Sequence, residues 1–248
     1  ALKGAGFFLG GALLATNGFS GAIAAMALAL FCVWLFSMVA LRRDLGKSSA
    51  KPKFSHLFSK SRSVNYLSAA RLFLFASRDV WFVVALPVYL ASTLGWQVQT
   101  VGAFLALWVI GYGVVQSQAP RFTQGRGGAP PTGRSVFFWS LPLALVPLLI
   151  AVGLHQGLAA QYGLLPGLLV FGFFFAVNSA LHSYLIVSYA QEDGVSLDVG
   201  FYYMANAMGR LLGTVLSGWV FQAWGLPMCL WISAGLIAVA AAISLHCD

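Results

Sequence analysis

Charged side chains inside apolar stretches are the residues of this chain that could do chemistry. Arg71, Arg78, Asp79 and Arg210 each lie within or beside a long apolar run. A charge in lipid is costly, so such residues face a protein interior or a water-filled path, where they bind one another or a substrate. Guanidinium groups suit phosphate-like oxygens because they bind two of them in a fork. The four charges therefore predict an anion site within the membrane.

Arg71 and Arg78 are two helical turns apart and project from one face, about 10 Å apart along the axis. Arg78 is predicted to contact substrate, whereas Arg71 either does so or extends its long side chain to the cytoplasmic interface. Asp79 lies about 100° around the helix from Arg78, so these two need not pair. Asp79 is predicted to bind Arg210 of another helix or to carry a coupling proton, with a purely structural ion pair as the alternative.

Polar residues at helical spacing occur on three other predicted helix faces. These sets are Tyr203 with Asn206 and Arg210, Asn178 with His182, and Trp108 with Tyr112 and Gln116. Each set is a candidate to line a hydrated cavity and contact substrate. The alternative, above all for His182, is hydrogen bonding between helices without substrate contact.

A stripe of small residues accompanies the polar residues of the next-to-last helix. Ala205, Gly209, Gly213 and Ser217 recur every four residues. Small residues at this spacing let helices approach closely in membranes. The stripe predicts a tightly packed helix pair.

Enzyme, metal and cofactor signatures are missing from the sequence. Cys32, Cys229 and Cys247 are isolated and form no C-x-x-C pair, so no thiolate metal site is predicted. Neither G-x-S-x-G nor H-E-x-x-H occurs. A membrane enzyme would need clustered acid, base or metal ligands, which one buried carboxylate and scattered histidines do not supply. We expect neither enzymatic activity nor a cofactor.

The elements that must position these residues are apolar helices in a lipid bilayer. The chain is 60% hydrophobic and 8% charged, whereas a soluble domain carries roughly 25% charged residues. Its apolar runs are continuous rather than alternating, which favours helices over a β-barrel. They span Ala22 to Ala40, Ala69 to Ser92, Val98 to Val115, Val136 to Leu154, Leu164 to Val187, Val199 to Val220 and Met228 to Leu245, with a shorter run from Gly4 to Thr16.

Basic residues concentrate in two of the connecting segments. Of the 14 lysines and arginines, the segments hold Arg42, Arg43, Lys47, Lys51, Lys53, Lys60 and Arg62, and Arg121, Arg126 and Arg134. Short basic loops stay in the cytoplasm, so both segments and the C-terminus are predicted to be cytoplasmic. Topology thus explains the net charge of +8 without a nucleic-acid partner.

The longest polar stretch divides the chain into two unequal parts. Residues 41–68 are predicted to be a basic cytoplasmic linker, in which Phe54, Leu57 and Phe58 share one face suited to an anionic leaflet. Residues 1–40 would be the last two helices of an N-terminal half, the first cut short, and residues 69–248 a six-helix bundle. This organisation fits a two-half transporter of the major facilitator type without its first four helices.

Several stretches closely resemble the organoarsenical efflux permeases of the ArsJ type, in the major facilitator superfamily. They are ALKGAGFFLGG, LFSKSRSVNYLSAARLFLFASRDVWFVVALPVYLASTLGW, GAFLALWVIGYGVVQSQAP, FAVNSALHSYLIVSYA and VGFYYMANAMGRLLGTVLSGWVFQAWGL. The similarity extends over essentially the whole chain. It includes the intramembrane Arg78 and Asp79 and the segment from Asn206 to Arg210.

The resemblance implies export of 1-arseno-3-phosphoglycerate across the bacterial inner membrane by alternating access, giving arsenate resistance. A companion glyceraldehyde-3-phosphate dehydrogenase makes this ester from arsenate. The residues agree in one respect, because Arg78 and Arg210 would offer fixed positive charge to an anionic substrate. Proton antiport is the hypothesis for the energy source, with Asp79 or His182 as carrier.

Two other functions fit the same residues. A major facilitator exporter of another small organic anion or of a drug would also use basic residues within the membrane. A membrane scaffold would leave Arg78, Asp79 and Arg210 without a substrate, and neutralising them would then change assembly rather than flux.

Overall fold

The computed structural model describes residues 2–40, 61–123, 130–190 and 195–247, and within these ranges every regular element is an α-helix. The all-α prediction is therefore confirmed for the described residues. The helices are α1 (Leu2–Ala40), α2 (Arg62–Phe82), α3 (Ala85–Ser92), α4 (Val98–Thr123), α5 (Gly133–His155), α6 (Ala160–Tyr189) and α7 (Val195–Ser244).

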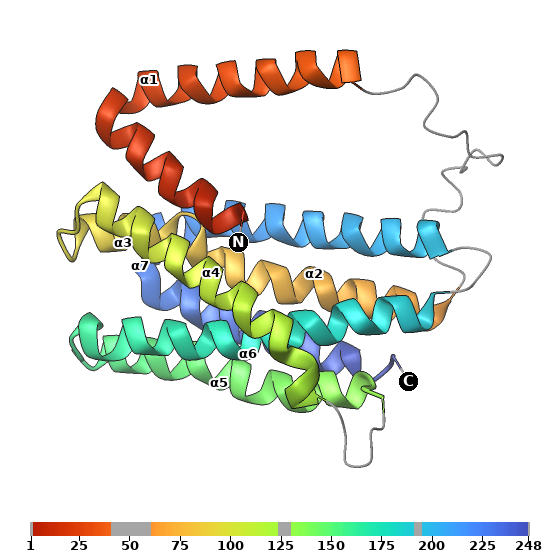
Figure 1. The fold of residues 1–248 in the computed structure, drawn as a ribbon. Coiled ribbons are helices and arrows are strands. Elements are labelled where there is room, and N and C mark those ends of the chain that lie inside the picture. Colours follow the sequence, from red (N-terminus) through yellow and green to blue (C-terminus); the bar gives the residue numbers. More distant parts are fainter. Residues whose placement is uncertain (1, 41–60, 124–129, 191–194, 248) are drawn as a thin grey trace.

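Two of these helices are each built from two limbs that meet at a glycine. Gly18 in α1 has φ 65° and Gly225 in α7 has φ 76°, left-handed values that glycine adopts without the steric cost of a Cβ. In α7 the second limb runs in the opposite direction to the first (Figure 1). The predicted runs ending at Val220 and beginning at Met228 are therefore two helical limbs joined by a tight turn at Gly225.

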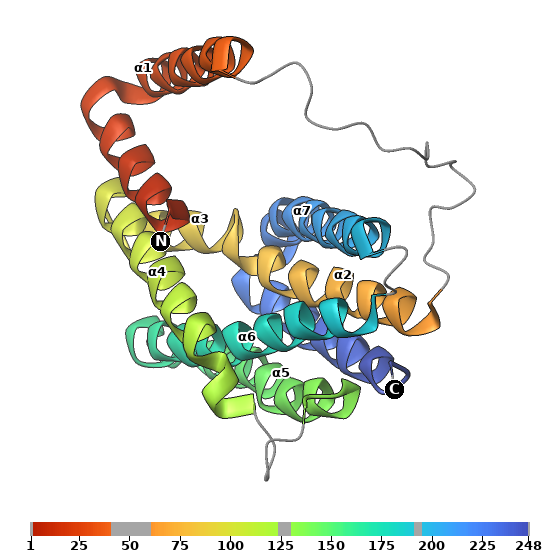
Figure 2. The same cartoon turned by 45° about the vertical axis from the view of Figure 1, so that its right-hand side comes forward.

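The helices have the length and composition of membrane-spanning segments. Six of the described segments are long and apolar enough to cross a bilayer, as in a multi-pass membrane protein. The first limb of α1 crosses α4, where Gly11 comes close to Gly102, while its second limb stands apart from the other helices (Figures 1 and 2). Large apolar side chains such as Phe36 and Val39 are exposed on that second limb.

Basic residues gather at one end of the bundle. Arg62 begins α2, Arg121 is in the last turn of α4 and Arg134 is in the first turn of α5. These three helix ends and the C-terminus lie on the same side of the molecule (Figure 1). The other basic residues of the two predicted cytoplasmic segments, and the predicted membrane-facing Phe54, Leu57 and Phe58, lie outside the described residues.

The predicted stripe of small residues is the contact between α2 and α7. A Cβ on Gly209 would overlap the carbonyl oxygen of Leu72, and one on Gly213 would lie 2.7 Å from the carbonyl oxygen of Ala76. Only glycine fits at both positions, because the backbone of α2 occupies the space of a side chain. The predicted close helix pair is confirmed.

The predicted apolar run from Ala69 to Ser92 lies within one segment long enough to cross a membrane, Arg62–Ser92, whose helix is interrupted at Val83 and Val84 between α2 and α3. Pro87 has no N–H to donate to the preceding turn, which weakens a continuous helix at this point. The hydroxyl oxygen of Ser217 on α7 accepts hydrogen bonds from the backbone N–H groups of Val84 (3.2 Å) and Ala85 (3.0 Å). A side chain from α7 thereby caps the start of α3.

Candidate anion-binding site

A cavity of about 600 Å³ opens between α2, α4 and α7. Its polar lining comes from four helices, and its remaining walls are largely aromatic and aliphatic. The lining residues are Arg71, Phe75, Arg78, Asp79, Phe82, Val83, Pro87, Leu105, Trp108, Val109, Tyr112, Gln116, Ser179, Asn206 and Arg210.

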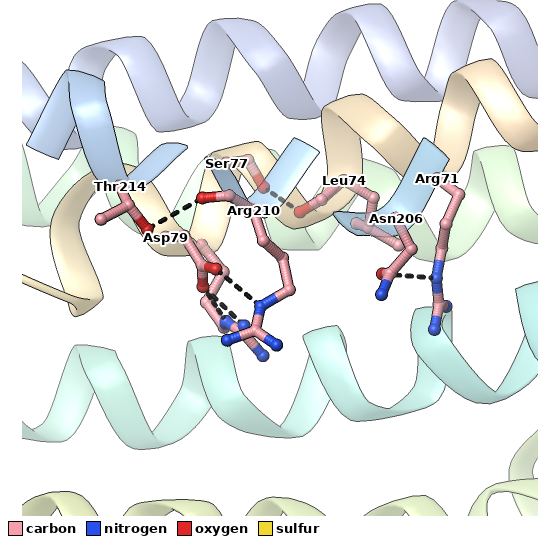
Figure 3. A network of polar contacts seen from close by, with 8 residues as sticks. Arg71, Leu74, Ser77, Asp79, Asn206, Arg210 and Thr214 are labelled. Atoms are coloured by element: carbon pink, nitrogen blue, oxygen red, sulfur yellow. Dashed lines mark hydrogen bonds and ion pairs between the residues drawn. The ribbon is translucent and has the colours of Figure 1, made fainter. Parts of the chain in front are cut away.

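Asp79 lies between two arginines at one end of this cavity. Its Oδ1 accepts a hydrogen bond from Arg78 Nε at 2.7 Å, and its Oδ2 accepts one from Arg210 Nε at 3.1 Å. Figure 3 shows Asp79 and Arg210 pointing toward one another from α2 and α7. The predicted pairing of Asp79 with Arg210 is confirmed. Asp79 also pairs with Arg78, which the 100° between neighbouring residues left open, because the long arginine side chain folds across that angle.

Arg71 occupies another part of the cavity and is bound only by neutral groups among the described residues. Its Nε donates to Asn206 Oδ1 at 3.2 Å (Figure 3), and its Nη1 donates to the carbonyl and hydroxyl oxygens of Ser179, both at 3.1 Å. The residue is 5% exposed. Arg71 therefore turns into the bundle, and the alternative that it extends to the interface does not describe this structure.

Aromatic rings cover the faces of both guanidinium groups. The ring of Phe75 lies 4.1 Å from Arg71 Cζ and 5.0 Å from Arg78 Cζ, one helical turn from each residue. Tyr202 and Phe175 supply further rings, at 5.0 Å from Arg71 and 5.3 Å from Arg78. Cation–π contacts stabilise a cation while leaving the edge of the guanidinium group available for hydrogen bonds.

The predicted polar face of α4 forms the opposite wall. Trp108, Tyr112 and Gln116 all line the cavity, as their spacing predicts. The indole of Trp108 stacks on Tyr112 and donates a hydrogen bond to the carbonyl oxygen of Leu168 at 2.8 Å. This bond to α6 holds the wall in place.

Three predicted site residues lie outside the cavity lining. Tyr203 is 58% exposed on α7. Asn178 bonds to α5 instead, accepting from Ser140 Oγ and donating to the carbonyl oxygen of Trp139, both at 2.9 Å. His182 is buried in α6 without lining the cavity. For Asn178, the alternative of hydrogen bonding between helices describes the structure.

Two residues near Arg71 were missed because each is one position from a predicted residue. Ser179 follows Asn178, and the 100° step between them turns Ser179 toward α2 while Asn178 faces α5. Tyr202 directly precedes Tyr203. Tyr202 is four residues before Asn206, whereas Tyr203 is three residues before it. A four-residue step leaves two side chains about 40° apart and a three-residue step about 60°, so the spacing slightly favours Tyr202.

The cavity holds a surplus of positive charge. Three guanidinium groups face one carboxylate, which leaves a formal charge of +2. In the described ranges no three His, Cys, Asp or Glu side chains are grouped so as to hold a metal ion. The arrangement suits the binding of an anion whose charge balances the arginines and whose body contacts the aromatic walls.

The chain matches no protein-family model and no curated protein sequence. Membership of the organoarsenical permease family therefore remains a prediction from the sequence stretches quoted above. The cavity is the basis for assigning a function.

Proposed function

We propose that this protein carries a small organic anion across a membrane. The observation that supports this proposal is the +2 formal charge of a cavity lying among helices long and apolar enough to cross a bilayer. Charge inside a membrane protein is retained mainly along substrate and ion paths, because its burial is otherwise unfavourable. Arg71, Arg78 and Arg210 would bind the anionic groups, and Asn206, Ser179 and Tyr112 would bind neutral oxygens of the substrate.

The specific substrate that we propose is 1-arseno-3-phosphoglycerate. The resemblance of the sequence to organoarsenical efflux permeases supports this choice, as does the fit between two anionic groups and a cavity with three arginines. In this proposal the protein is a major facilitator of the bacterial inner membrane, with its basic end in the cytoplasm. It works by alternating access together with a glyceraldehyde-3-phosphate dehydrogenase that supplies the ester.

The aromatic walls favour a second candidate, export of another organic anion or of an amphipathic drug. Phe75, Phe82 and Trp108 would stack on the aromatic or apolar part of a substrate. A phosphorylated three-carbon acid has no such part. The two candidates differ in what they require of the cell. Only the organoarsenical exporter needs the dehydrogenase.

Arsenate resistance tests the proposal. Arsenic-sensitive bacteria would produce the protein with and without glyceraldehyde-3-phosphate dehydrogenase, and growth on arsenate and cellular arsenic would be measured. We expect higher resistance and lower cellular arsenic only when both proteins are present. Unchanged arsenic content despite confirmed insertion into the membrane would exclude the organoarsenical substrate, and a change in drug tolerance would then favour the second candidate.

Variants connect the phenotype to the cavity. Arg78→Gln and Arg210→Gln each remove one positive charge, and we expect each to abolish most of the resistance at equal protein level in the membrane. Tyr203→Phe is the matched control on α7, because this side chain is exposed and outside the cavity lining. Full resistance in both arginine variants would exclude these residues from substrate binding.

A further inference from the structure

Asp79 is an anion that the protein itself supplies to its anion-binding cavity. The carboxylate is fully buried and uses both oxygens, one on Arg78 and the other on Arg210. Arg78 directs both Nε and Nη2 to Oδ1, so a forked edge of this guanidinium group is already occupied. Two of the three arginines that line the cavity are therefore engaged before any substrate enters.

Arg71 differs from these two arginines in having no carboxylate partner among the described residues. Asn206 and Ser179 orient its guanidinium group and take up its Nε and Nη1 donors, while Nη2 makes no hydrogen bond to any described residue. An incoming anion thus meets an available cation at Arg71. At Arg78 and Arg210 the anion competes with Asp79.

We infer that binding of an anion in this cavity is linked to protonation of Asp79. An anion that takes the forked edges of Arg78 and Arg210 displaces the carboxylate from both partners and places negative charge beside it. A buried carboxylate that loses its ion pairs and gains a like-charged neighbour is disfavoured in its charged form. A proton from water then neutralises Asp79, and the same proton leaves when the anion departs and the ion pairs form again.

Among the described titratable groups that line the cavity, Asp79 is the one that can accept a proton. Arg71 and Arg78 of α2 and Arg210 of α7 are hydrogen-bond donors, and a guanidinium group offers no atom that accepts a further proton. Tyr112 is the titratable residue that α4 contributes to the lining, and a phenol is ordinarily neutral near pH 7. The α6 lining residue is Ser179, while His182 of the same helix is buried outside the lining. Asp79 is the only carboxylate among the described lining residues.

The linkage determines the direction in which anion affinity changes with pH. The anion-bound state holds one proton more than the free state, so affinity for the anion increases as pH falls, at most about tenfold per pH unit. The anion and the proton occupy the cavity together. Proton antiport requires the opposite, because the two then compete for the same carrier. The linkage therefore disagrees with the antiport hypothesis for Asp79: in the proposed export a proton would leave with the anion, and the gradient of the anion itself would drive both.

The inference rests on the proposed anion transport and is tested by counting protons during binding. The purified protein in detergent would be titrated with 3-phosphoglycerate at pH 8, where its phosphate is already fully ionised. Calorimetry in two buffers with different ionisation enthalpies gives the number of protons taken up. We expect about one proton per bound anion for the natural protein and about none for Asp79→Asn. Asp198→Asn, which removes a buried carboxylate outside the cavity, should keep the uptake of the natural protein.

The outcomes separate the inference from the proposed function. Binding of 3-phosphoglycerate without proton uptake by the natural protein overturns the inference and leaves anion binding intact. Absence of binding overturns the proposed anion function and the inference with it. Infrared difference spectra of the natural protein provide a second measurement that does not depend on the Asp79→Asn variant folding. A protonated carboxyl band must appear when the anion is added, and its absence contradicts the inference.

Discussion

Two polar clusters among the described residues can be compared, one between α5 and α6 and one between α2 and α7, and the second lines the cavity. Between α5 and α6, the amide of Asn178 accepts from Ser140 and donates to the carbonyl oxygens of Trp139 and Phe174, which uses its hydrogen-bonding groups completely with neutral partners. Between α2 and α7, by contrast, the charges of the arginines exceed that of Asp79. At the centres of the two clusters, Asn178 and Asp79 are each fully buried. What marks a candidate binding site is therefore charge left uncompensated beside open volume, rather than burial or polarity alone.

The largest effect is expected from a substitution that separates α2 and α7, the two helices that hold the arginine cluster. Gly209→Leu places a side chain where the backbone of Leu72 lies, so α7 cannot stay against α2. We expect loss of the folded protein, seen as aggregation or degradation when membranes are extracted in mild detergent. Gly218→Ala on the same helix has open space around the added Cβ and should leave a monodisperse protein. A well-folded Gly209→Leu variant would contradict the close contact.

Removing Arg71 tests the difference between the two polar clusters directly, because it removes a charge and leaves the packing of the small-residue stripe on α7 unchanged. A hydrogen bond to a charged group contributes about 1.5–3 kcal/mol, so Arg71→Gln should weaken binding of 3-phosphoglycerate by roughly 10- to 150-fold. The melting temperature in detergent should change little or increase, since an uncompensated buried charge is lost. Equilibrium binding and thermal unfolding measure the two effects. Unchanged affinity would remove Arg71 from the anion site.

Asn178→Leu should lower stability and leave anion affinity unchanged, the reverse of what we expect for Arg71→Gln. The side chain joins α5 to α6, and hydrogen bonds between membrane helices contribute about 0.6 kcal/mol on average, so the stability loss should be about 1 kcal/mol. The single hydroxyl hydrogen of Ser140 can then be donated to the carbonyl oxygen of Val136, 2.8 Å away, which limits this loss. Anion affinity should equal that of the natural protein. Weaker anion binding with unchanged stability would contradict this role and show that Asn178 belongs to the anion site.

The smallest expected difference is between two neighbouring tyrosines. Tyr202→Leu removes a ring 5.0 Å from Arg71, and a cation–π contact contributes about 0.5–1 kcal/mol at exposed sites and about 2 kcal/mol when it is buried, as here. The ring contacts Arg71 with and without a bound anion, so we expect only part of this energy to appear in anion affinity, as a decrease of roughly a few-fold. Tyr203→Leu changes an exposed side chain and should leave the affinity unchanged. Equal effects of the two substitutions would show that the ring of Tyr202 does not support Arg71.

Much of the fold could be predicted from the sequence, because hydropathy and helical periodicity are local properties. The apolar runs, the small stripe from Ala205 to Ser217 and the polar face of Trp108, Tyr112 and Gln116 all follow from spacing. The break between α2 and α3 was missed even though Pro87 was visible. A proline in a membrane helix does not by itself break the helix, since neighbouring groups can satisfy the freed backbone. Here the neighbouring group is the hydroxyl of Ser217 on another helix.

The site was harder to predict than the fold, because helical spacing locates a face only to within one residue. Asn178 and Ser179 are adjacent, and the sequence holds no information on which of them faces α2. Pairing between Arg78 and Asp79 was missed for a different reason. Helix geometry gives the directions of the Cβ atoms, whereas the flexible arginine side chain determines where its guanidinium group lies.

The four-residue repeat on α7 leaves the position of this helix along α2 underdetermined. Shifting α7 by four residues, about 6 Å, would place one small residue where another had been, so the stripe alone fits several alignments. Three polar contacts distinguish among them: Ser217 with the backbone at Val84 and Ala85, Arg71 with Asn206, and Arg210 with Asp79. Of these, only the contact of Arg210 with Asp79 joins two opposite charges. The alignment of these two helices is therefore partly held by electrostatics, and it is sensitive to any change that neutralises Asp79.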